Sequence, residues 1–485
     1  MTAINEPNYD EALVPDYILP DPLMCADGTP VGTPEDWFNR RRPELLALFE
    51  REMFGKMPPR LEGMWFEQTS YCPDALGGFA VRKEVRIHFT PGSAGPCLNL
   101  LLYLPAAAKS PVPVFLSLNY KGNQAIDLDP GIAISDAWVL PGTPGIVDNH
   151  PTEASRGMTA NRYPVAMVLG RGYGLATACY GDLDPDYDDG FQNGIHPLFY
   201  QPGQTRPAPD EWGAIGAWAW GLSRAMDYLL SDPAVDPARV AVHGHSRLGK
   251  TALWAGACDP RFALVISNNS GCCGAALSRR CYGETVGLIA ARFPQWFCTN
   301  FQKYAGNEAA LPFDQHELIA LIAPRPVYIA SAVEDRWADP RGEFLGGVHA
   351  SPVYRLLGVE GLEASEMPAL NQPVFSRIGY HIRAGKHDVT AFDWQCYLDF
   401  ADRWMKGKQP AANIRRLQGA NLDIDLATAP GAISWEQTPC PWNEAEHTLA
   451  HRCAVKNTSI CPYFCGVEYL DTLLCCYPDP NPKAS

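Results

Sequence analysis

The sequence predicts a three-layer α/β fold, in which a mainly parallel central sheet lies between two layers of helices. Three observations support this prediction. Short apolar runs rich in β-branched residues recur along the 485 residues, as they do in buried parallel strands. Segments of helical periodicity separate several of these runs. The 44 prolines and 42 glycines are spread throughout, which is typical of many short elements joined by structured loops.

Seven of the apolar runs are predicted to be strands, and three amphipathic segments are predicted to be helices. The strands span residues 97–105, 112–120, 173–180, 239–244, 262–270, 325–332 and 379–385. The helices span 35–55, 213–232 and 393–407. The loops 121–165 and 181–211 lack such periodicity and are rich in Asp, Gly, Pro and Tyr. We therefore expect these two loops to contribute the substrate-binding surface.

The strand and helix pattern fades after Gly407, so we expect a single α/β domain over 1–410 and a C-terminal extension over 411–485. Six of the 16 cysteines fall in the extension: Cys440, Cys453, Cys461, Cys465, Cys475 and Cys476. An irregular, partly oxidised or poorly ordered tail is the preferred interpretation. A metal cluster with His447 and His451 is the alternative, but the paired C-x2-C spacing of structural zinc sites is absent. We therefore predict no metal site and no cofactor.

Composition and net charge limit the classes of molecule that the protein is expected to bind. Hydrophobic residues make up 46% of the chain and charged residues 19%, which is a globular composition. The 39 basic and 54 acidic residues give a net charge of −15, which argues against nucleic acid or an anionic membrane as the main partner. No apolar run is long enough to span a bilayer. The first 20 residues lack the basic and apolar regions of a secretory signal, so the compartment stays open.

Ser246 is the candidate nucleophile. It follows the predicted strand 239–244 and precedes the helical pattern RLGKTALWAGA, with Gly244 and Gly249 on either side. A nucleophile elbow requires this context, because a tight turn exposes the serine and the helix N-terminus supplies backbone N–H groups. The spacing is G-x-S-x-x-G rather than G-x-S-x-G, so the motif alone is also compatible with an ordinary turn.

The remaining triad candidates follow in the order that an α/β-hydrolase fold requires, Ser, then acid, then His. Glu334 and Asp335 come after the predicted strand 325–332, and His387 comes after the predicted strand 379–385. The imidazole would activate the hydroxyl, and the carboxylate would hold the imidazole in the correct tautomer. We prefer Asp335 as the acid and keep Glu334 as the alternative. A non-catalytic Asp335 would instead cap the loop or form an ion pair with Arg336.

The other histidines have a simpler interpretation. We expect His243, His245, His316 and His381 to be packing or hydrogen-bonding residues. His245 adjoins the nucleophile and could face the pocket.

Several segments resemble the glucuronoyl esterases, carbohydrate esterase family 15, and particularly their bacterial branch. They are GHSRLGKTALWAGA (244–257), SNNSGCCGAALSRRCYGETV (267–286), the stretch 294–344 with its VEDRWADP loop, GYHIRAGKHDV (379–389), the entry segment 19–37 and NYKGN (119–123). The resemblance covers roughly residues 17–406. It implies a secreted or periplasmic α/β-hydrolase that cleaves esters between the 4-O-methyl-glucuronic acid of glucuronoxylan and the alcohols of lignin. We expect the protein to be a monomer.

The resemblance also implies roles for individual residues. Ser246 and His387 correspond to nucleophile and base, and Arg247 to an oxyanion-stabilising residue. Lys250, Glu284 and Trp337 occupy positions that resemble the family's uronate contacts. These residue types suit the chemistry. A guanidinium offsets an anionic intermediate, an ammonium and a carboxylate bind hydroxyls, and an indole offers a flat face to a sugar ring.

The chain departs from many members of this family at two positions. His245 stands where fungal members have a disulfide-bonded cysteine. Asn269 stands where those members carry the triad acid in an E-S-G context. An amide cannot stabilise an imidazolium as a carboxylate does, which directs attention to the VEDRWADP loop.

Two other functions compete with a glucuronate esterase. An acetylxylan esterase or general carboxylesterase would use the same triad but would need no cations beside the acyl group. A non-catalytic carbohydrate-binding protein would need no triad at all. Arg247 and Lys250 favour the uronate ester over the first alternative, and the set Ser246, Asp335 and His387 argues against the second.

Overall fold

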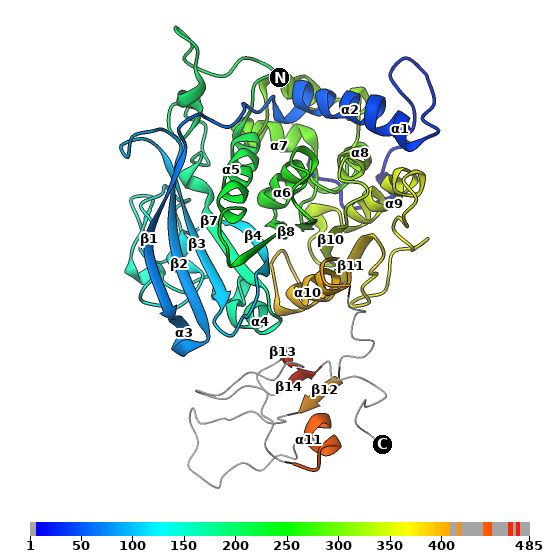
Figure 1. The fold of residues 1–485 in the computed structure, drawn as a ribbon. Coiled ribbons are helices and arrows are strands. Elements are labelled where there is room, and N and C mark those ends of the chain that lie inside the picture. Colours follow the sequence, from blue (N-terminus) through cyan, green and yellow to red (C-terminus); the bar gives the residue numbers. More distant parts are fainter. Residues whose placement is uncertain (1–5, 408–414, 419–439, 449–463, 469–471, 476–485) are drawn as a thin grey trace.

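The computed structural model describes residues 6–407, 415–418, 440–448, 464–468 and 472–475 (Figure 1). Its centre is a nine-stranded sheet in the order β1-β2-β3-β7-β4-β8-β9-β10-β11. Strands β7, β4, β8, β9, β10 and β11 are parallel neighbours, whereas β1, β2 and β3 pair antiparallel at one edge. This arrangement is the predicted α/β-hydrolase architecture with a mainly parallel sheet.

All seven predicted strands are present with small changes at their ends. They are β3 (Cys97–Pro105), β4 (Val112–Asn119), β7 (Gly174–Cys179), β8 (Val235–His245), β9 (Leu264–Asn268), β10 (Val327–Ala332) and β11 (Ile378–Arg383). Every residue of β4, β7, β9, β10 and β11 is buried, as continuous apolar runs predict for strands covered on both faces.

Strands β1 (Trp65–Asp74) and β2 (Ala80–His88) were not predicted. Polar residues interrupt both sequences, because β1 is a largely exposed edge strand and β2 alternates between buried and partly exposed positions. A search for fully apolar runs finds parallel central strands and overlooks such antiparallel edge strands.

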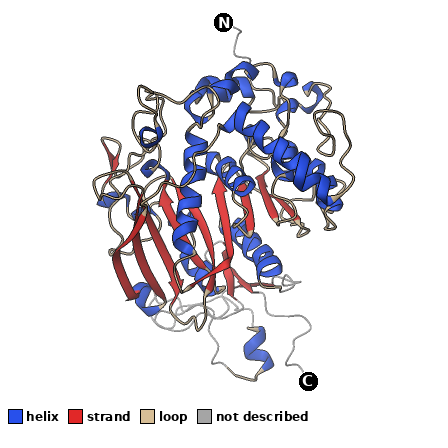
Figure 2. Cartoon of the chain, turned by 45° about the horizontal axis from the view of Figure 1, so that its top comes forward, coloured by secondary structure: helices blue, strands red, loops and turns tan. Residues whose placement is uncertain are grey.

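Helices cover both faces of the sheet, as Figure 2 shows. One face carries α2 (Arg42–Phe49), α5 (Ala214–Leu229), α6 (Arg247–Cys258), α7 (Val286–Arg292), α8 (Gln315–Ala320) and α9 (Pro340–Leu356). The other face carries α4 (Val165–Gly170) and α10 (Ala391–Met405). Short helices α3 (Ala75–Gly78) and α11 (Pro441–Ala445) lie elsewhere in the chain.

The predicted helix 35–55 is a continuous helical stretch. It comprises α1 (Pro34–Asp36), α2 and the turns between and after them, Trp37–Arg41 and Glu50–Phe54. A reciprocal capping box between Thr33 and Asp36 starts it. It ends at Gly55, whose φ of 81° and whose contact with Glu211 and Trp212 leave no room for a side chain.

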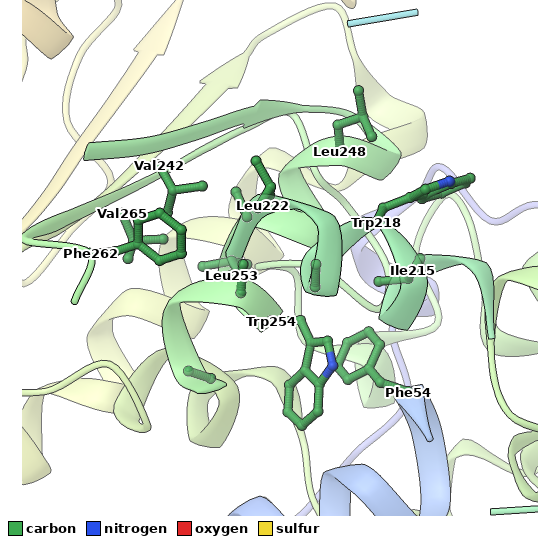
Figure 3. Close-up of a cluster of buried hydrophobic side chains, with 14 of the residues drawn as sticks. Phe54, Ile215, Trp218, Leu222, Val242, Leu248, Leu253, Trp254, Phe262 and Val265 are labelled. Atoms are coloured by element: carbon green, nitrogen blue, oxygen red, sulfur yellow. The ribbon is translucent and has the colours of Figure 1, made fainter. Parts of the chain in front are cut away.

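The core next to Ser246 is built from α5 and α6 against the sheet (Figure 3). Trp254 on α6 stacks on Phe54 with ring centroids 4.7 Å apart, and Leu253 packs near Val242 and Val265 of the sheet. This packing fixes the helix that starts directly after Ser246.

The described residues contain no helix long and apolar enough to cross a bilayer. Only short pieces of the predicted extension 411–485 are described, among them β12 (Arg415–Gln418), β13 (Phe464–Glu468) and β14 (Thr472–Cys475), which form a small antiparallel sheet. The predicted character of the cysteine-rich tail and the domain boundary at 410 fall largely outside the described residues and stay predictions.

Candidate active site

Ser246 lies on a strained turn between β8 and α6. Its backbone has φ 58° and ψ −127°, a conformation that costs a non-glycine residue on the order of 1–3 kcal/mol and is maintained by the surrounding structure. A Cβ at Gly244 would lie 1.8 Å from the carbonyl oxygen of Leu248, and one at Gly249 would lie 3.2 Å from that of Gly244. Close backbone approach therefore requires glycine at position 244 and leaves little room for a side chain at position 249, and the turn has the geometry of a nucleophile elbow despite the unusual spacing.

Asp335 and His387 form the predicted acid and imidazole pair. The Nδ1 atom of His387 lies 2.6 Å from Oδ2 of Asp335. Asp335 is 5% exposed, whereas the neighbouring Glu334 is exposed on the protein surface. The carboxylate accepts a hydrogen bond from Nδ1–H, which leaves Nε2 of His387 as the nitrogen able to accept a proton from a hydroxyl.

Asn269 supports the same carboxylate. Its side-chain amide donates a hydrogen bond of 2.7 Å to Oδ2 of Asp335, the oxygen that also binds His387. Asn269 follows β9 and has a φ of 46°. Asn269, which stands where fungal members carry their acid, thus hydrogen-bonds directly to the candidate acid Asp335. The sequence analysis did not predict this contact.

One cavity of about 360 Å³ brings the predicted site residues together. Glu334 does not line this cavity. The predicted residues that do are Ser246, His387, Asp335, Arg247, Lys250, Glu284 and Trp337.

Arg247 is held beside Ser246 by residues that the sequence did not indicate. Its guanidinium forms an ion pair with Asp186 and lies over the ring of Trp296, 4.6 Å from the centroid. Asp186 also accepts a hydrogen bond of 2.7 Å from the indole N–H of Trp296. Asp186 belongs to the loop 181–211, which was expected to reach the substrate surface, but several acidic residues there made the individual partner unpredictable.

Lys250 and Glu284 form a buried pair that lines this cavity. Lys250 is 3% exposed and donates to the carbonyl oxygen of Ser270 at 2.5 Å, and its Nζ lies 3.5 Å from Oε2 of Glu284. Lys250 is therefore a buried residue and not a solvated lysine on the helix surface. The backbone N–H of Glu284 bonds the carbonyl of Trp337 at 2.9 Å, which ties these two loops together.

A second cavity of about 420 Å³ meets the first at Ser246, Arg247 and His387. The loop 121–165 supplies much of its lining, as expected for a substrate-facing loop. Lining residues from this loop include Lys121, Leu140, Met158 and Arg162, and those from other segments include Tyr120, Tyr180, His245 and Asp388.

The remaining histidines pack or hydrogen-bond as expected. His243 packs between Trp394 and Tyr397, His316 bonds the carbonyl of Pro20, and His381 bonds Asp393. His245 differs, because it lines the second cavity. Within the described ranges no three His, Cys, Asp or Glu side chains are grouped as a metal site would need.

Comparisons with known proteins agree with this geometry. Residues 204–358 match the family model described as glucuronyl esterase, fungi. Carbohydrate esterase MZ0003 from an unknown prokaryotic organism is 52% identical over 401 residues, which cover 82% of this chain and 92% of that protein. The 4-O-methyl-glucuronoyl methylesterase of Schizophyllum commune is 29% identical over 352 residues, covering 70% of this chain and 74% of the relative.

Solved structures lead to the same family. A structure described as a promiscuous CE15 esterase from a marine bacterial metagenome has a TM-score of 0.78 and 52% identity, covering 82% of this chain and all of that one. The glucuronoyl esterase from Solibacter usitatus has a TM-score of 0.77 and 49% identity, covering 81% of this chain and 99% of its own. By sequence and by fold, the chain belongs to carbohydrate esterase family 15, the glucuronoyl esterases.

Proposed function

We propose that the protein hydrolyses esters of 4-O-methyl-glucuronic acid, of the kind that join glucuronoxylan to lignin alcohols, through an acyl-enzyme on Ser246. The observation that carries this proposal is the single cavity that unites a Ser, His and Asp set with a cation beside the serine and a buried Lys–Glu pair. The named relatives 4-O-methyl-glucuronoyl methylesterase and glucuronoyl esterase support the same substrate.

The acylation step uses the residues around the elbow. Nε2 of His387 takes the proton of the Ser246 hydroxyl as the oxygen attacks the ester carbonyl, and Asp335 stabilises the imidazolium that forms. The tetrahedral oxyanion accepts hydrogen bonds from the backbone N–H of Arg247 at the start of α6 and from its guanidinium. His387 then protonates the departing alcohol oxygen as the carbon–oxygen bond breaks.

The deacylation step repeats this chemistry with water. The oxygen of a water molecule attacks the acyl carbon while His387 takes one of the water protons. His387 then gives this proton to the Ser246 oxygen as the uronate leaves. Asn269 assists both steps indirectly, because its hydrogen bond keeps Asp335 in place for His387.

Recognition of the sugar falls to Lys250, Glu284 and Trp337. The carboxylate of Glu284 can accept hydrogen bonds from two neighbouring hydroxyls, and the Lys250 ammonium donates to an oxygen. The half-buried indole of Trp337 offers a flat apolar face to the pyranose ring. The ion pair with Asp186 orients Arg247, so its guanidinium is in place before the oxyanion develops.

Acetyl esters are a second candidate substrate. The relative described as a promiscuous CE15 esterase, at 52% identity, favours this broader activity. An acetyl group would react at the same Ser246 but would leave the Lys250 and Glu284 pair without a ligand.

A comparison of esters tests the proposal. Rates should be measured for benzyl glucuronate, methyl glucuronate, acetylated xylose and p-nitrophenyl acetate with the wild type, Ser246→Ala and Glu284→Gln. We expect Ser246→Ala to lose all hydrolysis while keeping the wild-type melting curve. Glu284→Gln should lower kcat/KM for the glucuronates about tenfold or more and leave p-nitrophenyl acetate nearly unchanged. A clear preference of the wild type for the acetyl esters would overturn the glucuronate assignment.

A further inference from the structure

The second cavity places an additional imidazole beside the reacting groups. His245 precedes the nucleophile in the chain, lines this cavity and has its ring centroid 4.5 Å from that of His387. Ser246 and His387 line the same cavity. The mechanism above uses neither nitrogen of His245.

The neighbours of His245 determine its tautomer. Its Nδ1 lies 2.6 Å from Oδ1 of Asn268. The other end of that amide, Nδ2, donates to the hydroxyl of Tyr397 at 2.7 Å and faces Asp393 at 3.3 Å. Oδ1 is therefore the acceptor, so Nδ1 of His245 carries the hydrogen. Nε2 is left as an acceptor on the ring that faces the cavity.

His245 stays neutral at this position. Burial lowers the pKa of His245 well below its ordinary value of 6.5, and the adjacent His387 and the nearby Arg162 lower it further. The lowered pKa favours the neutral imidazole, in which Nε2 accepts a hydrogen bond, and disfavours competition with His387 for the serine proton.

Most other charged groups at this cavity are hydrogen-bond donors that already have acceptors. Lys121 donates to the Leu140 carbonyl at 2.9 Å and to the Thr143 hydroxyl at 2.7 Å. Arg162 donates to Asp388 at 2.6 Å, and Arg247 is paired with Asp186. Asp388 differs because it is a hydrogen-bond acceptor. Its Oδ1 already accepts hydrogen bonds from the guanidinium of Arg162 and from the backbone N–H of Val389.

This inference rests on the proposed function, in which the two cavities hold different parts of the substrate. The sugar ring contacts Lys250, Glu284 and Trp337 in the first cavity. The alcohol therefore leaves through the second cavity, and the water that resolves the acyl-enzyme enters by the same side, because attack and departure occur on the same face of the carbonyl carbon next to His387.

We propose that Nε2 of His245 binds the second hydrogen of the hydrolytic water, so that the acyl-enzyme is resolved by water in preference to alcohols. The water donates one O–H to Nε2 of His387, which takes that proton during attack. The other O–H stays intact, donates to His245 and ends as the hydroxyl hydrogen of the uronic acid product. The bond from the acyl carbon to the Ser246 oxygen breaks, and His387 returns the proton to that oxygen.

Water and an alcohol differ in how many of the two imidazoles they can hydrogen-bond through an O–H. Methanol has one O–H, which must face His387 for reaction, and therefore gains nothing from the acceptor on His245. Loss of this acceptor should slow attack by water more than attack by methanol. The ratio of transesterification to hydrolysis thus reports on His245 separately from the overall activity.

The experiment measures this partition ratio for benzyl glucuronate over a series of methanol concentrations, as methyl glucuronate formed relative to free glucuronate. We expect His245→Phe, which keeps a ring against His387, to raise the ratio about five- to tenfold, the effect of one lost hydrogen bond. His245→Gln, which keeps an acceptor, should stay close to the wild type. Asp388→Asn, a change at another acceptor of the same cavity, should leave the ratio unchanged.

A positioning role alone would give a different result. If His245 only held the ring of His387, His245→Phe would slow methanolysis and hydrolysis by the same factor, and an unchanged ratio overturns the proposal. A raised ratio in Asp388→Asn with none in His245→Phe would assign the water to Asp388 and overturn it as well.

A second measurement tests the proposal in the event that His245→Phe folds poorly. Rapid quenching followed by intact-mass analysis should then show more glucuronoyl-enzyme in His245→Leu than in the wild type, because deacylation is slowed while acylation is not. Equal amounts of acyl-enzyme would contradict the proposal. Failure of the proposed function itself would be distinguishable, because the wild type would then release no benzyl alcohol from benzyl glucuronate.

Discussion

Replacement of Asp335 by Asn tests the proposed acid of the triad most directly. The carboxylate oxygen lies 2.6 Å from Nδ1 of His387, so the charge centres of carboxylate and imidazolium are about 4 Å apart. At an effective dielectric constant of about 20, this attraction is worth about 4 kcal/mol. Because about 1.4 kcal/mol corresponds to a factor of ten in rate, Asp335→Asn should lower kcat on the order of 10³-fold.

The amide orientation does not rescue the variant. If the Asn oxygen faces His387, the tautomer is retained but the charge is lost. If the Asn nitrogen faces His387, two donors oppose each other and Nδ1 must give up its hydrogen, which leaves the wrong tautomer for catalysis. The Asn269 amide, a donor to the same oxygen at 2.7 Å, favours the first arrangement.

Glu334→Gln is the matched control for this experiment. Glu334 is exposed and adjoins Asp335 in the same loop, so its loss should change kcat less than about threefold, as is usual for a surface charge. Steady-state kinetics with benzyl glucuronate, with melting curves as the folding control, measure both variants. A loss below tenfold in Asp335→Asn, or a larger loss in Glu334→Gln, would refute the assignment of the acid.

Two further predictions concern the scaffold of the site. Gly244→Ala would place a methyl group 1.8 Å from the Leu248 carbonyl, so calorimetry should show a destabilisation of about 3–5 kcal/mol; an unchanged melting temperature would contradict the tight elbow. Glu343 on α9 accepts a hydrogen bond of 3.0 Å from the backbone N–H of Gly271, two residues after Asn269. Burial raises the pKa of Glu343 to about 8 from its ordinary 4.5. Between pH 5 and 8 the native state then holds a proton that the unfolded state has lost, so wild-type stability should fall as pH rises, by up to about 1.4 kcal/mol per unit. Urea unfolding should show this decline reduced in Glu343→Gln, and parallel curves for the two proteins would contradict it.

Much of the scaffold could be predicted because its signals are local. Continuous apolar runs marked the central parallel strands, and the order of Ser246, the VEDRWADP loop and His387 placed the three groups after strands of one parallel sheet. Parallel strands end at the same edge of a sheet, so residues that directly follow them converge. The edge strands β1 and β2 escaped detection because their exposure breaks the apolar pattern.

The details of the site could not be predicted, because they depend on contacts between distant segments. Asp186 and Arg247 are 61 positions apart and pair through a loop without periodicity. Asn269 and Asp335 are 66 positions apart, and nothing in either local sequence indicates that the amide binds the acid. The tautomer of His245 follows from Asn268, whose own amide is oriented by side chains of α10.

The class of fold, the chain order of the candidate reactive residues and the family resemblance could all be inferred from the sequence, because periodicity and short motifs are properties of neighbouring residues. The folded arrangement was needed to show which of two adjacent carboxylates meets His387, which groups hold Arg247, and that two cavities join at Ser246. Hydrogen bonds and ion pairs act over about 3 Å, and this separation is set by the packing of segments that are distant in the sequence.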